Sequence, residues 1–134
     1  MSETPVEPGP LEGLNLINIP IIDTHLHIWD IDHLNYPWLA GEPATNRTHM
    51  VADYREATRG IDIEKMVFLQ CDPELAQCVD EAAWVTAQAQ EDPRIAGIVA
   101  GAPLENGDAA RDTIEALLAF PLLHGIRRIT QGAA

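Results

Sequence analysis

The strongest constraint on the fold is a regular alternation of strand-like and helix-like segments. Strand-like segments begin near residues 21, 65, 95 and 125. The last two intervals are about 30 residues each, the usual size of a β-α-β unit, and the first is longer by roughly 14 residues. The alternation predicts a parallel sheet with crossover helices. The longer interval predicts an insert after the first strand, where α/β proteins build their sites.

The expected strands are residues 19–28, 65–70, 94–102 and 125–130. The second is apolar enough to be buried on both faces. Helices are expected at 51–59, at 72–92 with Asp72 as N-cap, and at 108–120 with Asp108 as N-cap and an apolar stripe that includes Leu118. Residues 1–18, rich in Pro, Gly and Glu, are expected to be a flexible tail before a domain at 19–134.

The charge balance bears on partners and compartment. Eight basic against 21 acidic residues give a net charge of −13. Such a surface repels phosphate backbones and anionic membranes, so neither nucleic acid nor a membrane is an expected partner. Only Cys71 and Cys78 are present, as expected buried hydrophobes rather than a disulfide framework. With no secretory pattern and no long apolar run, the expected location is the cytoplasm.

The sharpest chemical feature is the triplet His25-Leu26-His27 in the first strand. Alternate residues of a strand point the same way, so both imidazoles share a face, with Asp23 on the same side. Their α-carbons are about 6.6 Å apart, which lets both rings reach one cation. Two histidines in an apolar strand need partners, and a shared metal is one solution. A hydrogen-bonded structural pair is the other.

The segments around this pair resemble a known family. They are IIDTHLHIWD at 21–30, YPWL at 36–39, VFLQ at 67–70, EAAW at 81–84, DPRIAGIV at 92–99, APLE at 102–105 and HGIRRI at 124–129. Together they are similar to the amidohydrolase-related (amidohydrolase 2) proteins of the amidohydrolase superfamily, and most to the branch that opens sugar-acid lactones. The resemblance implies a TIM (β/α)₈ barrel. A complete barrel has about 250 residues, so four units would be its N-terminal half.

The resemblance also implies a reaction. His25 and His27 would hold a divalent metal, with zinc the expected ion, at the barrel mouth beside the substrate carbonyl. Metal-bound water with a pKa lowered toward about 7 would open a lactone or a cyclic amide or ester. Some members of the lactonase branch work without a tightly held metal, so the pair could bind the carbonyl directly. The family's other ligands and bases lie on later strands, so the catalytic residues are expected outside these 134 residues.

Five more residues are candidates for binding a small-molecule substrate. Arg127 and Arg128 point to opposite faces of the fourth strand, so one can face the barrel and either bind an anion or form a structural salt bridge. Gln70 lies at the carboxyl end of the second strand, where it either contacts a substrate or lies in solvent. Trp29 and Trp38 of the insert either line the pocket or pack the loop down.

Two other hypotheses fit the same residues. A half-barrel leaves its first and fourth strands unpaired, and unpaired edges favour self-association, so the chain could be a catalytically inactive fragment. A four-stranded open sheet could instead be a small domain whose histidine pair binds a ligand without reaction. His33 and His49 of the insert are expected to lie in solvent.

Overall fold

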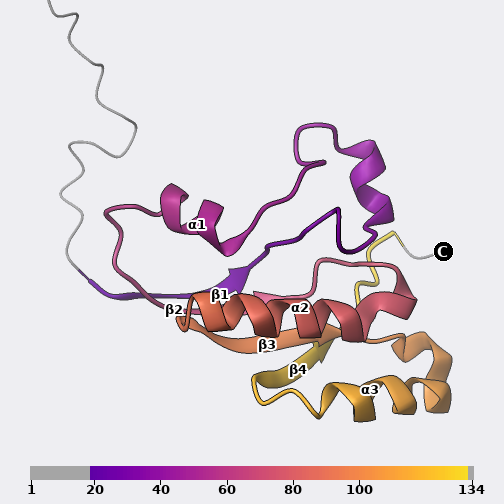
Figure 1. Ribbon diagram of the computed structural model, residues 1–134. Coiled ribbons are helices and arrows are strands. Elements are labelled where there is room, and N and C mark those ends of the chain that lie inside the picture. The colour runs from indigo at the N-terminus through magenta and orange to yellow at the C-terminus, as the bar shows by residue number, and fades with distance from the viewer. Residues whose placement is uncertain (1–18, 133–134) are drawn as a thin grey trace, which may run out of the picture.

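A four-stranded parallel sheet forms the centre of the molecule (Figure 1). The computed structural model describes residues 19–132, so the expected tail at 1–18 lies outside the described residues. The strands are β1 (Ile21–Leu26), β2 (Ile63–Leu69), β3 (Ile95–Gly101) and β4 (Leu123–Arg127), paired in chain order. The helices are α1 (Val51–Ala57), α2 (Cys78–Glu91) and α3 (Arg111–Leu117). Short 3₁₀ segments lie at Pro37–Gly41, Leu75–Gln77 and Leu104–Ala110. The predicted α/β alternation with a parallel sheet is confirmed.

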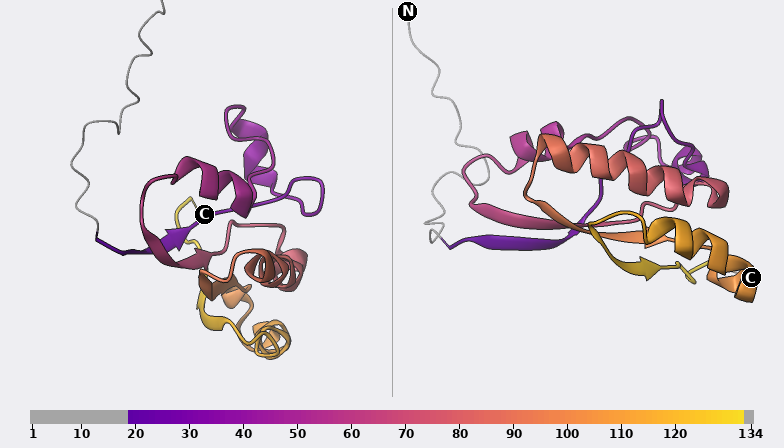
Figure 2. Two further views of the ribbon diagram at one scale, coloured as in Figure 1. Left: turned by 60° about the vertical axis from the view of Figure 1, so that its left-hand side comes forward. Right: turned by 60° about the horizontal axis from the view of Figure 1, so that its bottom comes forward.

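The helices cover one face of the sheet (Figures 1 and 2). Met66, Phe68 and Ile98 are 0% exposed and form the core between the sheet and α2 and α3. Val67 and Leu69, which alternate with the buried residues of β2, are only half-buried. The expectation that β2 is buried on both faces is therefore wrong, because no helix within residues 19–132 covers the second face. None of these helices is long and apolar enough to cross a membrane.

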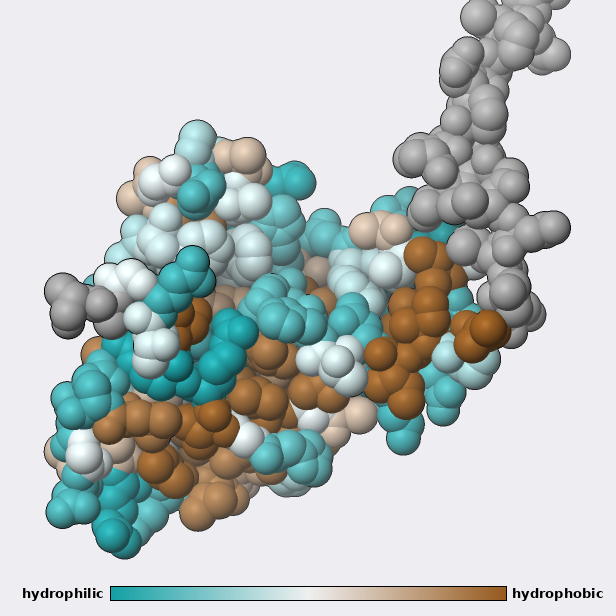
Figure 3. Space-filling view, turned by 180° about the vertical axis from the view of Figure 1, so that it is seen from behind, coloured by the Kyte–Doolittle hydropathy of each residue, from teal (hydrophilic) through white to brown (hydrophobic). Residues whose placement is uncertain are grey.

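Apolar side chains gather on the face of the molecule seen from behind (Figure 3). Ile19, Ile21 and Ile22, at the amino end of β1, are 56%, 43% and 55% exposed. Within the described residues, β1 and β4 each pair with a neighbour on one side only. Exposed apolar strands with an unpaired edge favour association with another strand, so self-association through these edges stays a prediction.

The first helix is bounded much as its sequence predicts. The Asp53 carboxylate accepts a hydrogen bond from the Met50 backbone N–H at 2.7 Å, which satisfies a donor at the start of α1. Gly60 has φ +84°, in the left-handed region that ends helices. The α-helix itself ends at Ala57, two residues before the predicted boundary.

The predicted N-cap of the second helix is wrong. Asp72 has φ +56°, a left-handed conformation that is rare for a residue other than glycine. Its N–H donates to Gln70 Oε1, and its carboxylate pairs with Arg128 at 3.3 Å. The Asp72 side chain is thus turned toward β4 instead of the helix. A 3₁₀ turn follows, and α2 begins only at Cys78.

The third helix and the last strand also differ from prediction. Gly107, with φ +58°, interrupts the 3₁₀ segment, so α3 begins at Arg111 and Asp108 is not its cap. Leu118, expected in the apolar stripe, lies just beyond the helix and is 68% exposed. β4 spans Leu123–Arg127 instead of 125–130. It ends where Arg128 turns to pair with Glu105 at 2.6 Å.

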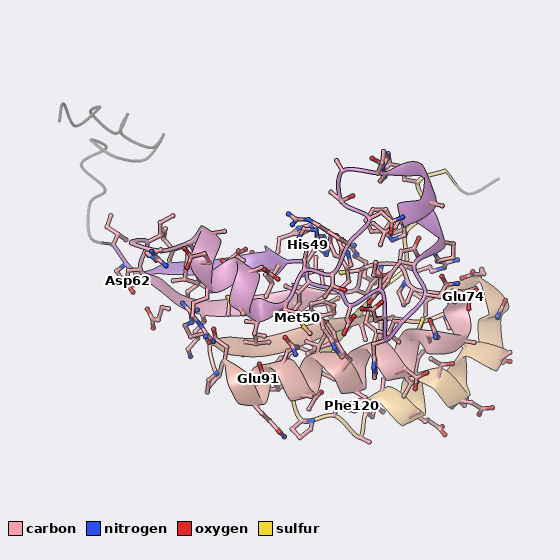
Figure 4. All side chains as sticks on the ribbon, turned by 45° about the horizontal axis from the view of Figure 1, so that its top comes forward. His49, Met50, Asp62, Glu74, Glu91 and Phe120 are labelled. Carbon is pink, nitrogen blue, oxygen red and sulfur yellow. The ribbon has the colours of Figure 1, made fainter. Side chains whose placement is uncertain are left out.

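Parallel pairing places the carboxyl ends of all four strands at one edge of the sheet. Asp62, which precedes β2, and Glu74, which follows it, lie at opposite ends of the molecule, with His49 between them (Figure 4). The insert, residues 29–50, is tied to this carboxyl edge by Trp38, whose indole Nε1–H donates to the Cys71 carbonyl at 2.8 Å. The residues that follow β1 and β2 are therefore brought together.

Candidate functional site

His25 and His27 converge at the carboxyl end of β1. Their Nε2 atoms are 2.9 Å apart, and the rings meet edge to face with centroids 4.7 Å apart. His27 Nδ1 lies 3.0 Å from the Leu69 carbonyl oxygen, which can only accept, so Nδ1 carries the hydrogen. In neutral His27 the Nε2 lone pair therefore points at His25, whose Nε2–H donates to it. The β-strand period thus predicted a real convergence of the two imidazoles.

Burial keeps His27 neutral. It lowers the pKa of His27, and the neighbouring charges of His25 and Arg127 lower it further, while the Leu69 carbonyl and Asp23 act in the opposite direction. A neutral imidazole whose Nδ1–H is held by a backbone carbonyl is the usual state of a metal-binding histidine. The orientation of His27 is therefore that of a ligand, and a metal would take the place of the His25 N–H at its Nε2.

The pair fits two positions around one divalent metal. Two nitrogen ligands of a tetrahedral zinc lie about 3.3 Å apart, given bonds of about 2.0–2.1 Å, so small ring movements would open the 2.9 Å separation to that value. Asp23 does not join the pair, because its Oδ2 accepts the Tyr54 hydroxyl at 2.6 Å and its Oδ1 accepts the His25 backbone N–H. Among residues 19–132 no group of three His, Cys, Asp or Glu side chains is placed to hold a metal.

A cavity of about 430 Å³ opens beside His27. It is lined by His27, Trp29, Trp38, Cys71, Asp72, Arg127 and Ile129. The two indoles meet edge to face at 5.6 Å, and Trp29 is fixed by a bond from its Nε1–H to the Arg47 carbonyl at 2.8 Å. The structure therefore places both tryptophans of the insert in the wall of a cavity. Their contact with a substrate stays a prediction.

Arg127 and Arg128 diverge. Arg127 Nη2 donates to the Gln70 carbonyl at 3.0 Å, and the guanidinium borders the cavity, where its Nε is buried without a hydrogen-bond partner among the described residues. Arg128 instead forms ion pairs with Glu105 and Asp72. The structure thus leaves Arg127 as the arginine placed to meet a ligand in this cavity and gives Arg128 a structural contact.

Gln70 lies at the carboxyl end of β2, as predicted, but its side chain turns away from the cavity. Its side chain is buried, and its Oε1 accepts the Asp72 N–H instead of facing the cavity. Because Met66, Phe68 and Gln70 alternate along β2, the Gln70 side chain lies on the helix side of the sheet. It therefore shapes the turn after β2, and direct binding of a substrate by Gln70 has no support in these contacts.

Three cavity residues were not predicted as site residues from the sequence: Cys71, which was expected only as a buried hydrophobe, Asp72 and Ile129. The Asp72-Pro73 dipeptide is typical of a helix start, whereas its position directly after a strand is the signal that could have placed it at the site. His49 was expected in solvent, but it pairs with Trp29 in an isolated β-bridge, and its ring lies 4.9 Å from the indole. His33 is exposed as expected.

The fold and this site define an α/β protein with a histidine pair and an apolar cavity at the carboxyl edge of a parallel sheet. No family model matches the chain. A solved structure, amidohydrolase 2 from Bifidobacterium longum subsp. infantis, is similar to 64% of this chain with a TM-score of 0.54 and 28% identity, over 34% of its own chain. The fold is thus amidohydrolase-like.

A curated relative is the uncharacterized protein y4mH of Sinorhizobium fredii. It is 27% identical over 120 residues, which cover 83% of this chain and 40% of the relative. The chain therefore spans about two fifths of the length of that relative.

Proposed function

We propose that this chain carries part of the active site of a metal-dependent hydrolase that opens a lactone or a cyclic amide or ester. The observation that carries the proposal is the convergence of His25 and His27 Nε2 at 2.9 Å beside a cavity bordered by Arg127. The similarity to an amidohydrolase supports the hydrolase class. The remaining ligands and the catalytic base belong, on this proposal, to residues outside the described part of the chain.

His25 and His27 would hold the metal through Nε2, with the Leu69 carbonyl fixing the tautomer and direction of the His27 ring. When bound, a divalent metal, zinc by the nature of its ligands, would supply a water of lowered pKa and polarise the substrate carbonyl. The two neutral imidazoles leave the net charge of the ion uncompensated, which favours an anionic or strongly polarised substrate oxygen.

Arg127 and the two tryptophans would position the substrate. The Arg127 guanidinium borders the cavity and has N–H groups besides the one that Nη2 donates to the Gln70 carbonyl, so it can donate to a carboxylate or ring oxygen of a substrate. Trp29 and Trp38 offer flat apolar walls that exclude water from a small ring. An oxygen-rich ring of the sugar-acid lactone type fits this combination of one cation and two indoles.

Metal binding is the first test. Zinc binding to the full chain would be measured by calorimetry and elemental analysis for the wild type, His25→Ala, His27→Ala and, as matched control, His124→Ala, an exposed histidine at the amino end of β4. We expect both site variants to bind zinc at least tenfold more weakly, while the control matches the wild type. Equal zinc binding by all four proteins would contradict the site.

Turnover is tested separately by following acid release from aldono-1,4-lactones with a pH indicator. A ligand-binding domain without turnover is the second candidate function, favoured because no third His, Cys, Asp or Glu side chain among residues 19–132 is placed to share a metal with the histidine pair. Zinc or lactone binding that depends on the histidine pair, with no acid release, would favour this second function.

A further inference from the structure

A buried carboxylate lies behind the cavity wall. Glu81, in the first turn of α2, is 1% exposed. The Tyr36 hydroxyl donates to its Oε2 at 2.9 Å, and the Cys71 backbone N–H donates to Oε1 and Oε2 at 3.3 and 3.2 Å. One carboxylate thus joins three segments that are distant in sequence: the insert, the end of β2 and α2.

These contacts lead directly to the cavity. Cys71 lines the cavity, and its carbonyl accepts the Trp38 indole N–H at 2.8 Å. Trp38 follows Tyr36 by two residues, and Asp72 follows Cys71 in its left-handed conformation. The Trp38 indole forms one wall of the cavity. Glu81 therefore holds both the loop that carries this indole, through Tyr36, and the Cys71 peptide that the indole contacts.

The two forms of Glu81 differ in what they can bind. Both oxygens of the carboxylate accept hydrogen bonds, so a proton on Oε1 competes with the Cys71 N–H, and a proton on Oε2 displaces the bond that the Tyr36 hydroxyl now donates unless that hydroxyl turns to accept. Burial raises the pKa of Glu81 to about 7, against the two hydrogen bonds that favour the charged form. Of the charges facing it, Asp72 raises this pKa and Arg127 lowers it. The neighbouring thiol Cys78 stays protonated near neutrality, because burial raises its pKa to about 11.

We propose that Glu81 is a positioning residue for the cavity: ionised, it holds Tyr36 and the end of β2 and fixes Trp38 against Cys71, and protonated, it releases this wall. Glu81 touches no substrate in this arrangement and acts through Tyr36 and Cys71. The inference does not depend on the reaction proposed above, since it concerns only the shape of the cavity.

The test follows the indole N–H signals of the three tryptophans, by nuclear magnetic resonance on the ¹⁵N-labelled full chain between pH 5.5 and 8.5. Trp38→Phe assigns the Trp38 signal. As the pH falls through about 7, we expect the Trp38 signal to shift and its hydrogen exchange to rise at least several-fold, with Trp84 unchanged. This pH-dependent change of the Trp38 signal should vanish in Glu81→Gln. It should persist in the control Glu91→Gln, because Glu91 is an exposed residue of the same helix.

His27 also lines the cavity, and its protonation could shift the Trp38 signal too. Because the pKa of His27 lies below the ordinary value of 6.5, a signal change caused by His27 would come at lower pH and would persist in Glu81→Gln. Tyr36→Phe gives a second test, because losing a bond to the charged form should raise the midpoint of the Trp38 transition. The proposal is overturned if the wild-type Trp38 signal has no transition between pH 6.5 and 8, if Glu81→Gln keeps it, if Tyr36→Phe leaves its midpoint unchanged, or if all three indoles change together.

Discussion

Neutralising Asp92 should destabilise the fold in a pH-dependent way. The Asp92 carboxylate follows α2 and is 5% exposed, and it accepts bonds from Arg94 Nε at 2.9 Å and Nη2 at 2.7 Å. Arg55 of α1 approaches the same carboxylate at 3.4 Å, so one side chain links α1, α2 and the start of β3. The hydrogen bonds from Arg94 lower the pKa of Asp92 from 3.8 to about 2.

The size of the effect follows from this pKa. A fall from 3.8 to about 2, at about 1.4 kcal/mol per pH unit, corresponds to about 2.4 kcal/mol of stability at pH 7. Arg94 is 31% exposed, so water screens the pair and about 1–2 kcal/mol is the better expectation. Because the pKa is depressed in the folded protein, the contribution is complete above about pH 5, falls to about half at pH 3 and is nearly gone below pH 2.

Urea unfolding of the wild type and Asp92→Asn at pH 7 and pH 3 measures this contribution. We expect the difference in unfolding free energy between the two proteins to be about twice as large at pH 7 as at pH 3. Asp62→Asn is the control, because Asp62 is exposed and has no ion pair within residues 19–132. A difference that is the same at both pH values would refute the reasoning, since it would come from lost packing alone.

Three further changes test the fold. Phe68→Ala removes a fully buried ring and should cost about 3–5 kcal/mol in urea unfolding; a loss below about 1 kcal/mol would contradict the placement of this ring in the core. Gly60→Ala should cost about 1–2 kcal/mol, because a left-handed φ of +84° strains an L-residue although no atom lies within 4 Å of the added carbon. Ile22→Glu, opposite Lys65 on β2, should reduce concentration-dependent association in light scattering; equal association of variant and wild type would show that β1 is not the contact.

The sequence predicted the parts of the fold that depend on local pattern. Apolar runs separated by helical periods were sufficient to predict four parallel strands, whereas their order was implied only by the barrel of the similar family. The period of a strand was sufficient to bring His25 and His27 together. The ends of helices and strands were less predictable, because they depend on contacts between residues that are distant in the sequence. β4, for example, ends where Arg128 turns away to meet Glu105, a residue 23 positions earlier.

The same reason explains the errors at the site. Asp72 has the sequence of a helix cap, and only the contacts of Gln70 and Arg128 turn it into a left-handed corner of the cavity. Gln70 lies at the expected end of its strand, but the alternation of β2 sends its side chain to the helix side. A sequence pattern can place a residue at the carboxyl edge of a sheet, whereas the side to which it turns depends on its partners.

The turn after β2 is where these partners concentrate. Peptide groups of residues 70–72 bond to the side chain of Gln70 within the turn and to three side chains from other elements: Trp38, Glu81 and Arg127. A non-glycine residue at positive φ costs of order 1–3 kcal/mol and persists only when its surroundings over-determine it, as they do around Asp72. Such strain is common at ligand-binding sites, and the Asp72 corner lies in the wall of the cavity that also contains His27 and Arg127. The hydrogen bonds of this turn and its strained corner are therefore a second reason, besides the histidine pair, to propose the carboxyl edge as the functional end of the sheet.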